Sequence, residues 1–404
     1  DIGGDKMNRE DFPMLKQDII YFDNSATTFK PKQVLEAITD YYTKYTSNAH
    51  RGDYKTSLKV DMLYEETREI VKDFINAKHS KEIIFTSGAT NSLNTVAFGF
   101  AKYNLKPGDE ILLTKTEHAS NVLPWIELSK QIDIKIKYIP LDKNLKLQTN
   151  TLKNAITKKT KLVSVAHVTN TVGDVRDLKE IGDVLKDKGI YFVVDAAQSA
   201  GHRKIDVQDM NIDFLAFSGH KMLGPTGIGV LYGKEELLEK TKPLNYGGGM
   251  NNFFESSGEV EYKQLPTRLE AGTQNIEGVL GLKEAILYLN KIGLKNIEKH
   301  DKELKDYFLE KIKEVDNIEI LNKEAEAGNI LFNIKGVFPQ DTAIYLDHYN
   351  ICVRAGNHCA KLLKDELGIK NTTRISFYIY NTKQEIDKLV EILKNSENIF
   401  EVVI

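Results

Sequence analysis

Two apolar segments in the middle of the chain each end abruptly in residues that carry chemistry. The segment Val193–Ser199 runs into Asp195 and then small residues, and the segment Asp213–Pro225 breaks at Ser218-Gly219-His220-Lys221. Short apolar runs of this kind are typical of buried parallel strands, and open α/β sheets bind their ligands beyond the C-terminal ends of such strands. The sequence therefore predicts an α/β protein whose site lies at these two strand ends.

Alternating helix-like and strand-like segments extend this pattern along the chain. Apolar spacing predicts helices over residues 31–46, 57–75, 91–103, 121–131 and 177–188, and strands over 82–86, 110–114, around 136, 162–168 and 191–195. This βαβ rhythm indicates a mainly parallel sheet with helices on both faces. After Gly272 come long charged helices over 276–292 and 294–315, strands near 330–334, 351–354 and 373–377, and a last helix over 383–395. That change predicts a smaller α+β domain.

The chain has 404 residues, more than one ordinary domain. We expect an N-terminal segment over 1–20, a large domain over 21–275 and a small domain over 276–404. Residues 1–6, which precede Met7, are interpreted as a cloning remnant.

Composition excludes several classes of function. Hydrophobic residues make up 41% and charged residues 28% of the chain, and the net charge is −3, which gives no electrostatic case for nucleic acid or an anionic membrane. No apolar run is long enough to span a bilayer, no signal peptide is recognised, and no metal site is expected. Only Cys352 and Cys359 are present, which favours a reducing, cytoplasmic compartment over a disulfide framework.

Lys221 and Asp195 together suit one kind of cofactor. A lysine just beyond a strand end can form an imine with an aldehyde, and an acid on the neighbouring strand end can hold a ring nitrogen protonated, as pyridoxal 5′-phosphate (PLP) requires. The alternative is a solvated lysine and a turn aspartate. The string from Ser218 to Tyr232, with its glycine-punctuated turn, resembles the class V aminotransferase family of fold-type I PLP enzymes, and within it the cysteine desulfurases. The resemblance implies a seven-stranded sheet in the large domain, PLP as cofactor and a homodimer.

The segment Val353–Ala360 resembles the catalytic-cysteine motif of group II desulfurases, the SUF-type enzymes and selenocysteine lyases. A thiolate is the sulfur nucleophile, and we expect Arg354, His358 and the glycine-rich backbone to lower the pKa of Cys359. Cys352, between Ile351 and Val353, fits a buried structural cysteine instead. The chain has 19 residues between Arg354 and Arg374, so the loop that carries Cys359 is expected to be short.

Thr86–Asn91 is a candidate phosphate turn, in which Ala89 and Thr90 open a helix whose free N–H groups favour an anion. By itself such a turn is a common βα connection. The resemblance implies that it holds the cofactor phosphate together with Ser218 and His220, and that Thr273 reaches the phosphate in the partner subunit.

The other candidate residues follow from side-chain chemistry and the same resemblance. His118 can stack on a pyridine ring and shuttle protons, although an incidental turn histidine is the alternative. Asn170 and Gln198 are expected to bond the cofactor's phenolic oxygen, or in the case of Asn170 the substrate, while His167 is interpreted as structural. Arg374 lies in an apolar strand and is expected to bind the substrate α-carboxylate, with a structural ion pair as the alternative.

Two further motifs match the family near the N-terminus. Tyr21–Thr28, which includes Ala26, resembles the family motif that lines the site, and His50-Arg51-Gly52 also matches. The chain departs from SUF-type enzymes at Asp53-Tyr54 and at Asn357, positions that bear on the sulfur acceptor and not on the cofactor chemistry. Arg354, Arg374, Asn170, Ala26 and His50 are therefore the expected substrate-binding residues.

The predicted function is a PLP-dependent cysteine desulfurase. It would convert L-cysteine to L-alanine and leave the sulfur on Cys359 as a persulfide, with Lys221 removing the α-proton and His118 as acid/base partner. A sulfur-acceptor protein would carry the sulfur to iron–sulfur cluster assembly or another biosynthesis. The alternatives are a selenocysteine lyase and a class V aminotransferase, which would need Lys221 and Asp195 but no loop cysteine.

Overall fold

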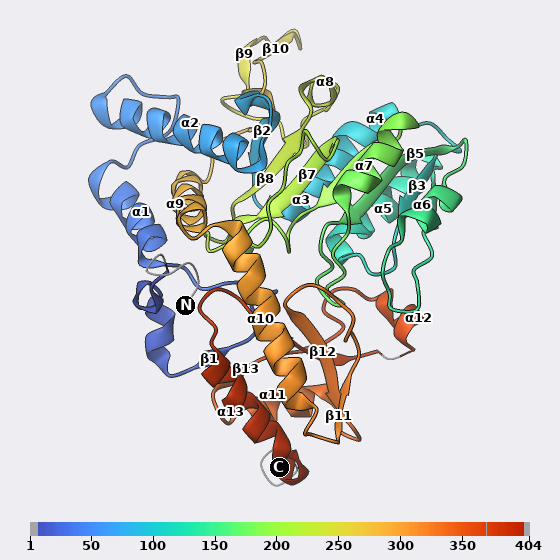
Figure 1. Ribbon diagram of the computed structural model, residues 1–404. Helices are drawn as coiled ribbons and strands as arrows, with labels where there is room; N and C mark the ends of the chain where they lie inside the picture. The colour runs from blue at the N-terminus through green and yellow to red at the C-terminus, as the bar shows by residue number, and fades with distance from the viewer. Residues whose placement is uncertain (1–6, 369, 400–404) are drawn as a thin grey trace.

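The computed structural model describes residues 7–368 and 370–399, and residues 1–6 lie outside this range. Two bodies stand one above the other in Figure 1: a large sheet with helices on both faces, and a smaller unit that contains the C-terminal part of the chain. The helix α10, Leu294–Ile312, runs from one body into the other. The α/β class predicted from the sequence is confirmed.

The large sheet has seven strands in the order β2-β8-β7-β6-β5-β3-β4. Within this sheet, β8 is the only described strand that runs antiparallel to both of its neighbours, and the other strand pairs are parallel. The strand bounds are β2 Ile83–Thr86, β3 Glu110–Leu113, β4 Lys135–Tyr138, β5 Thr160–Ala166, β6 Tyr191–Asp195, β7 Phe214–Ser218 and β8 Gly229–Gly233. The predicted mainly parallel sheet is therefore confirmed, and Asp195 and Ser218 end adjacent strands.

Both faces of this sheet are buried, which explains the nearly continuous apolar runs of its strands. Successive residues point to opposite faces, so Ile83 and Phe85 pack in one apolar cluster and Ile84 in the other. The first cluster is completed by α2 Lys55–Ile75, α7 Leu178–Asp187 and α9 Ile276–Ile292. The second is completed by α3 Ala89–Asn94, the π-helical turn Thr95–Ala101 and α5 Leu123–Ile132.

Helix boundaries follow local capping chemistry. The helix α1, Lys32–Lys44, starts directly after Pro31, and α7 starts where the Asp177 side chain accepts from the Glu180 N–H. Gly293, with φ of 91°, separates α9 from α10. The last helix, α13 Lys383–Lys394, begins with a capping box between Thr382 and Glu385. The remaining helices are α4 Lys102–Asn104, α6 Thr149–Ala155, α8 Glu235–Leu238, α11 Pro339–Asp347 and α12 Leu363–Leu367.

The smaller body is built on an antiparallel sheet in the order β11-β12-β15-β14. Its strands are β11 Ile318–Ile320, β12 Asn329–Ile334, β15 Thr372–Ser376 and β14 Arg354–Gly356. The N-terminal strand β1 Ile20–Tyr21 pairs in parallel with β13 Ile351–Cys352. Phe22 packs in the apolar cluster of this body, so residues 20–22 are fastened to the C-terminal body.

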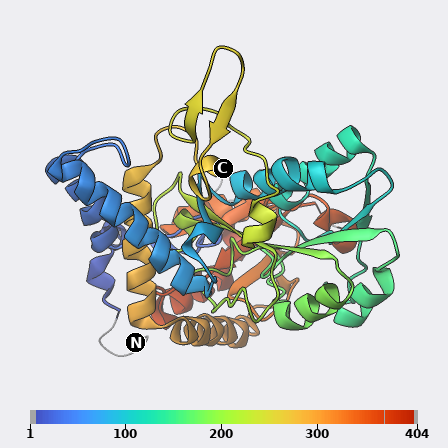
Figure 2. The same cartoon turned by 90° about the horizontal axis from the view of Figure 1, so that it is seen from above.

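A hairpin formed by β9 Asn251–Phe254 and β10 Val260–Tyr262 projects from the large body (Figure 2). The sequence analysis did not anticipate it, and its Phe254 side chain is exposed. The expected strand over 162–168 ends at Ala166 because the chain turns back there, with Val168 bridging Val175. The expected helix over 121–131 starts later, after a short 3-10 turn that His118 caps. Within residues 7–368 and 370–399, no helix combines the length and apolar character needed to cross a membrane.

Candidate active site

A cavity of about 250 Å³ lies where the strand ends of the large sheet meet the C-terminal body. It brings together most of the residues predicted as a site: Ala26, Ala89, Thr90, His118, Asn170, Asp195, Gln198, Ser218, His220, Lys221, Arg354, Cys359 and Arg374. These residues come from segments that are far apart in the chain, so the fold assembles the cavity. His50 and Thr273 lie outside it.

Lys221 follows β7 in a short 3-10 turn, and Asp195 is the last residue of β6. Burial lowers the pKa of Lys221 to about 8, and the positive charges of Arg374 and Arg354 act in the same direction, against Asp195. Burial raises the pKa of Asp195 to about 6, although the Ala197 N–H donates to its Oδ1 at 2.9 Å. The site therefore holds an amine and a carboxyl group whose pKa values both lie close to neutral pH.

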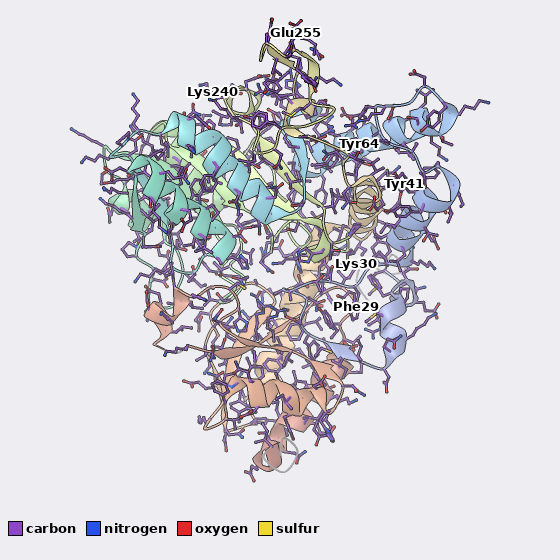
Figure 3. All side chains as sticks on the ribbon, turned by 180° about the vertical axis from the view of Figure 1, so that it is seen from behind. Phe29, Lys30, Tyr41, Tyr64, Lys240 and Glu255 are labelled. Atoms are coloured by element: carbon purple, nitrogen blue, oxygen red, sulfur yellow. The ribbon has the colours of Figure 1, made fainter. Side chains whose placement is uncertain are left out.

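The peptide carbonyl directly before Lys221 is held by four donors. The His220 carbonyl accepts from the Thr28 N–H at 2.9 Å, the Thr28 hydroxyl at 3.0 Å, the Thr27 hydroxyl at 3.1 Å and the Lys30 ammonium at 3.0 Å. Figure 3 shows Lys30 at the level where the two bodies meet. The Thr28 hydroxyl also accepts from the Leu223 N–H at 2.9 Å. These contacts fix the backbone on both sides of Lys221.

His118 lines the cavity as a neutral ring. Burial, together with the positive charges of Lys221 and Arg374, lowers its pKa to about 4. The Ser120 N–H donates to Nδ1 at 3.1 Å, which places the proton of the neutral ring on Nε2. A neutral, uncharged imidazole suits stacking on an aromatic ring and exchange of a proton through Nε2.

The predicted phosphate turn is compact. Gly88 has a φ of 151°, and a Cβ there would lie 3.3 Å from the Ser218 hydroxyl oxygen. That oxygen accepts from the Ala89 N–H at 2.8 Å, while the hydroxyls of Thr90 and Ser120 pair at 2.7 Å. The hydroxyl-bearing residues Thr90 and Ser120 and the N-terminus of α3 thus border the cavity. Ser218, at the end of β7, is joined to α3 by its hydrogen bond with Ala89.

Asn170 and Gln198 both use their amide nitrogens within the protein. The Asn170 Nδ2 donates to the His358 carbonyl at 2.7 Å, and the Gln198 Nε2 donates to the Ser25 carbonyl at 2.8 Å. The buried Asn170 Oδ1 has no hydrogen-bond partner among the described residues. An acceptor left free in a cavity indicates a position for a ligand N–H or O–H.

Cys359 is exposed and its loop is fastened to the large body. The Ala119 N–H, next to His118, donates to the Cys359 carbonyl at 2.7 Å. His358 and Cys359 both have positive φ values, 53° and 57°, which a free loop would avoid. The loop is therefore short and held in place, as the spacing between Arg354 and Arg374 predicts.

The expected electrostatic role of His358 is wrong. The ring is buried, its Nε2 lies 2.7 Å from the Thr372 hydroxyl, and burial together with Arg374 and Arg354 lowers its pKa to about 3. A neutral imidazole carries no positive charge to a neighbouring thiol. His358 holds the loop, and the sequence contained no sign of its burial. Cys352, in contrast, lies half-buried in β13, and burial raises its pKa, which fits the structural interpretation.

Arg374 is both a cavity residue and part of an ion pair. It is 2% exposed, and its two terminal nitrogens donate to the Asn170 carbonyl at 2.8 Å and to Asp23 Oδ1 at 3.1 Å. Its Nε has no partner among the described residues, and burial lowers its pKa. The structural ion pair that the sequence raised as the alternative is therefore present, and substrate binding by Arg374 stays a prediction.

His50 and Thr273 lie on another part of the surface. His50 is 3.2 Å from Glu65, whose carboxylate raises the pKa of the imidazole. Thr273 accepts from Asn48 at 3.2 Å and lines a separate hollow of about 190 Å³. Neither residue reaches the cavity of its own chain.

The sequence analysis missed the roles of Asp23, Thr27, Thr28 and Lys30. All four belong to or follow the motif Tyr21–Thr28, but their partners are about 190 to 350 residues away. The local sequence contained one signal for these roles, namely the run of polar residues that follows the short apolar strand before Asp23.

The class V aminotransferase family (Aminotransferase class-V) matches residues 20–389. The chain belongs to this family. Two curated relatives are named probable cysteine desulfurase. The one from Staphylococcus epidermidis is 44% identical over 97% of this chain and 96% of the relative. The one from Halalkalibacterium halodurans is 43% identical over 96% of this chain and 97% of the relative. The apo structure of a cysteine desulfurase from Thermococcus onnurineus NA1 superposes with a TM-score of 0.92 at 41% identity over 96% of each chain. The Escherichia coli cysteine desulfurase CsdA, in an S-sulfonic acid form, gives 0.90 at 35% identity over 98% of each chain. By these matches, this chain is a cysteine desulfurase within the class V aminotransferase family.

The cavity of this class V family member fits PLP on its own chemistry. Lys221 lies just beyond the end of β7, and Asp195 ends the neighbouring strand β6. Asn170, whose Oδ1 has no hydrogen-bond partner among the described residues, lines the same cavity as Cys359. A Cβ at Gly88 would crowd the Ser218 hydroxyl oxygen at 3.3 Å, and the φ of 151° is one that side-chain-bearing residues rarely adopt, so glycine suits the turn beside Thr90 and Ser218. A cofactor with an aldehyde, a ring nitrogen and a phosphate has a partner for each group.

Proposed function

We propose that this chain is a PLP-dependent cysteine desulfurase of the group II type, which converts L-cysteine to L-alanine and takes the sulfur onto Cys359. The observation that carries the proposal is one cavity lined by Lys221, Asp195 and the exposed thiol of Cys359. A class V aminotransferase would use the lysine and the acid, but it has no use for a thiol at the cavity.

PLP, when bound, supplies an electron sink for the pair of electrons released when the substrate Cα–H bond breaks. Lys221 and Asp195 would hold its aldehyde carbon and ring nitrogen, with Thr90, Ser218 and His220 at its phosphate. The lowered pKa of Lys221 suits the Nζ atom to take the α-proton at neutral pH. Arg374 would orient the substrate through its α-carboxylate.

Cys359 performs the sulfur step. Its Sγ attacks the substrate sulfur, so that an S–S bond forms while the substrate Cβ–S bond breaks and its electrons remain on carbon. The Cβ then takes a proton, which balances the proton that the Cys359 thiol loses when it becomes the nucleophile, and His118 on the cavity wall is the proposed acid/base partner for this transfer. The products are L-alanine and a persulfide on Cys359.

The sulfur must leave through a second protein. The Cys359 loop is tied to Ala119 and Asn170, so it is not a long arm that carries sulfur outward. We propose that a thiol-bearing acceptor protein docks at the exposed cysteine and feeds iron–sulfur cluster assembly or another sulfur-requiring pathway. Two unpaired cysteines support a reducing, cytoplasmic setting.

A homodimer would complete the site. Apolar side chains of Leu35, Tyr42, Leu58 and Met62 are exposed on α1 and α2, a surface that a second copy would cover. Thr273 lies outside the cavity of its own chain, and in a dimer it would reach the phosphate site of the partner subunit.

The proposal is tested by incubating the PLP-loaded protein with L-cysteine and a reductant and measuring L-alanine and sulfide. We expect equal amounts of both products from the wild type and almost none from Cys359→Ser. L-selenocysteine in parallel separates a desulfurase from a selenocysteine lyase. Transamination of the substrate without release of sulfide would contradict the proposal.

A further inference from the structure

The loop that carries Cys359 borders a second hollow besides the cavity. This hollow has a volume of about 310 Å³ and is lined by residues between Gly356 and Thr372. His358 lines both the hollow and the cavity, whereas Cys359 lines the cavity and not the hollow. The neighbours of Cys359 on both sides, His358 and Ala360, are therefore part of the wall of this hollow.

Three lysines make the hollow basic. Lys361, Lys364 and Lys370 line it with exposed side chains, and none of them forms an ion pair with a described residue. No described aspartate or glutamate lines it. Its floor is apolar, since Ala360 and Leu363 are buried and pack in one cluster. We call this hollow the lysine groove.

The acidic residues of α12 do not cancel this charge. Asp365 and Glu366 follow Lys364 in the helix, but neither lines the lysine groove, and Glu366 forms an ion pair with Lys115 at 3.2 Å. When Lys115 is counted with the three lysines of the groove, four ammonium groups face two carboxylates. This part of the surface therefore carries an excess of positive charge.

The neighbouring cavity brings no excess of negative charge. Its charged side chains, together with the carboxylate paired to its arginines, are Lys221, Arg354, Arg374, Asp195 and Asp23. Three are cations and two are carboxylates, so the thiolate form of Cys359 would bring the count to zero. The three histidines of the cavity add no charge, because burial holds the pKa of each at about 4 or lower. The excess beside Cys359 thus belongs to the lysine groove.

The lysine groove stays free in the dimer proposed above. Figure 1 shows α12 on the opposite side of the molecule from α1 and α2, and the view from above in Figure 2 agrees. A second copy that covers α1 and α2 therefore leaves room at α12 for a different protein.

We infer that the lysine groove docks an acidic segment of the sulfur-acceptor protein, directly beside the thiol that receives the sulfur. The inference rests on the proposed function, since it names the chemistry of the partner at that same site. Glutamate or aspartate side chains on the lysines would speed the encounter and hold the acceptor beside the loop.

The transfer itself is an exchange between a thiolate and a persulfide. The acceptor thiolate attacks the outer sulfur of the Cys359 persulfide and forms a new S–S bond with it. The old S–S bond breaks, and its electron pair stays on the Cys359 sulfur. Cys359 returns as a thiolate, the acceptor leaves with the persulfide, and no oxidant or reductant is consumed.

The test uses two synthetic ten-residue peptides as probes. Each has one cysteine, followed by four glutamates in the acidic peptide and by four glutamines in the neutral peptide. The PLP-loaded protein receives L-cysteine and one peptide at the same subsaturating concentration, without another reductant, and the initial rate of L-alanine formation is measured above the rate without peptide. We expect the acidic peptide to give a rate at least about tenfold higher than the neutral peptide.

The deciding variant combines Lys361→Gln, Lys364→Gln and Lys370→Gln, and its ratio of the two rates should fall below about two. A ratio taken within one protein cancels any change in the earlier sulfur step. Each single replacement should lower the ratio by about twofold, and these exposed single replacements decide the matter if the triple variant does not fold.

A matched control removes the same charge elsewhere. Lys186→Gln, Lys188→Gln and Lys204→Gln together replace three exposed lysines of the large body that line neither the cavity nor the lysine groove. This variant should keep the wild-type ratio. A ratio lowered equally in both triple variants would mean that overall charge, and not the groove, attracts the acidic peptide.

Three results would overturn the inference: equal rates with the two peptides in the wild type, an unchanged ratio in the groove variant, or equal losses in the groove variant and its control. Sedimentation velocity adds a fourth, because a changed oligomeric state of the groove variant would assign the groove to a contact between copies of this chain. The proposed function is judged separately, by L-alanine production from L-cysteine with dithiothreitol. An active wild type with a ratio of one defeats the inference alone, and an inactive wild type defeats the proposed function.

Discussion

At the scale of single residues, the surroundings of Lys221 decide its chemistry. An ordinary lysine keeps its proton to a pH of about 10. Burial, Arg374 and Arg354 disfavour the ammonium form here and lower the pKa to about 8, with Asp195 as the opposing influence. A lowered pKa means that the reactive amine appears as the pH rises through 8.

We therefore predict the pH dependence of imine formation when PLP is added to the cofactor-free protein. The rate should rise between about pH 7 and pH 8 and level off above about pH 9, because the amine is then nearly fully deprotonated. Stopped-flow absorbance measures this rate. A rate that keeps climbing to pH 10 would contradict the lowered pKa.

Lys30 provides a demanding control for this experiment. Burial lowers its pKa to about 8 as well, so pH alone does not separate the two lysines. Borohydride reduction followed by peptide mapping should place the pyridoxyl group on Lys221, and Lys221→Ala should remove it. A label on Lys30 would mean that the lysines have been assigned the wrong way round.

At the scale of elements, the segment after β1 acts as a clamp on the turn that carries Lys221. The Thr28 side chain is 3% exposed and bonds both the His220 carbonyl and the Leu223 N–H. Leu223 is fully buried, so its N–H has no access to water when the hydroxyl is removed.

Thr28→Val, which keeps the shape, should therefore lower the free energy of unfolding by about 1–3 kcal/mol. It should also weaken PLP retention, because the backbone beside Lys221 is loosened. Urea unfolding and cofactor release by dialysis measure the two effects. Thr149→Val, a surface position at the start of α6 where the hydroxyl bonds the Glu180 carboxylate, should stay within about 0.5 kcal/mol of the wild type. Equal effects of the two changes would show that the clamp is unimportant.

At the scale of the whole molecule, we predict that the protein is a dimer held through α1 and α2. Leu58 and Met62 are 57% and 63% exposed on α2, and replacing both by glutamate should place charges in the contact and yield single chains. Sedimentation velocity measures the change. Ile344→Glu, at a comparably exposed position on α11, should leave the dimer intact. A wild type that sediments as a single chain would rule out this arrangement.

How far the sequence predicts this molecule depends on the distance between partners. The string from Ser218 to Lys221 and the Cys359 motif carry their chemistry locally, and the cavity brings them together as expected. The hydrogen bond between Asp23 and Arg374 joins residues 351 positions apart, and no local sequence pattern predicts it. The hairpin whose tip carries Glu255 in Figure 3 was missed because its strands are short and largely exposed, without the apolar alternation of a half-buried strand. Burial also escaped prediction, as the neutral ring of His358 shows.

The central claim is that Cys359 takes the sulfur of L-cysteine at a cavity built around Lys221. Its most direct test is a single turnover with L-cysteine carrying a heavy sulfur isotope, followed by alkylation, proteolysis and mass spectrometry. We predict one additional, labelled sulfur atom on the peptide that contains Cys359, one L-alanine formed per sulfur, and an unchanged outcome in Cys352→Ser. Labelled sulfur on Cys352, or L-alanine formed at the wild-type rate by Cys359→Ser, would contradict the account.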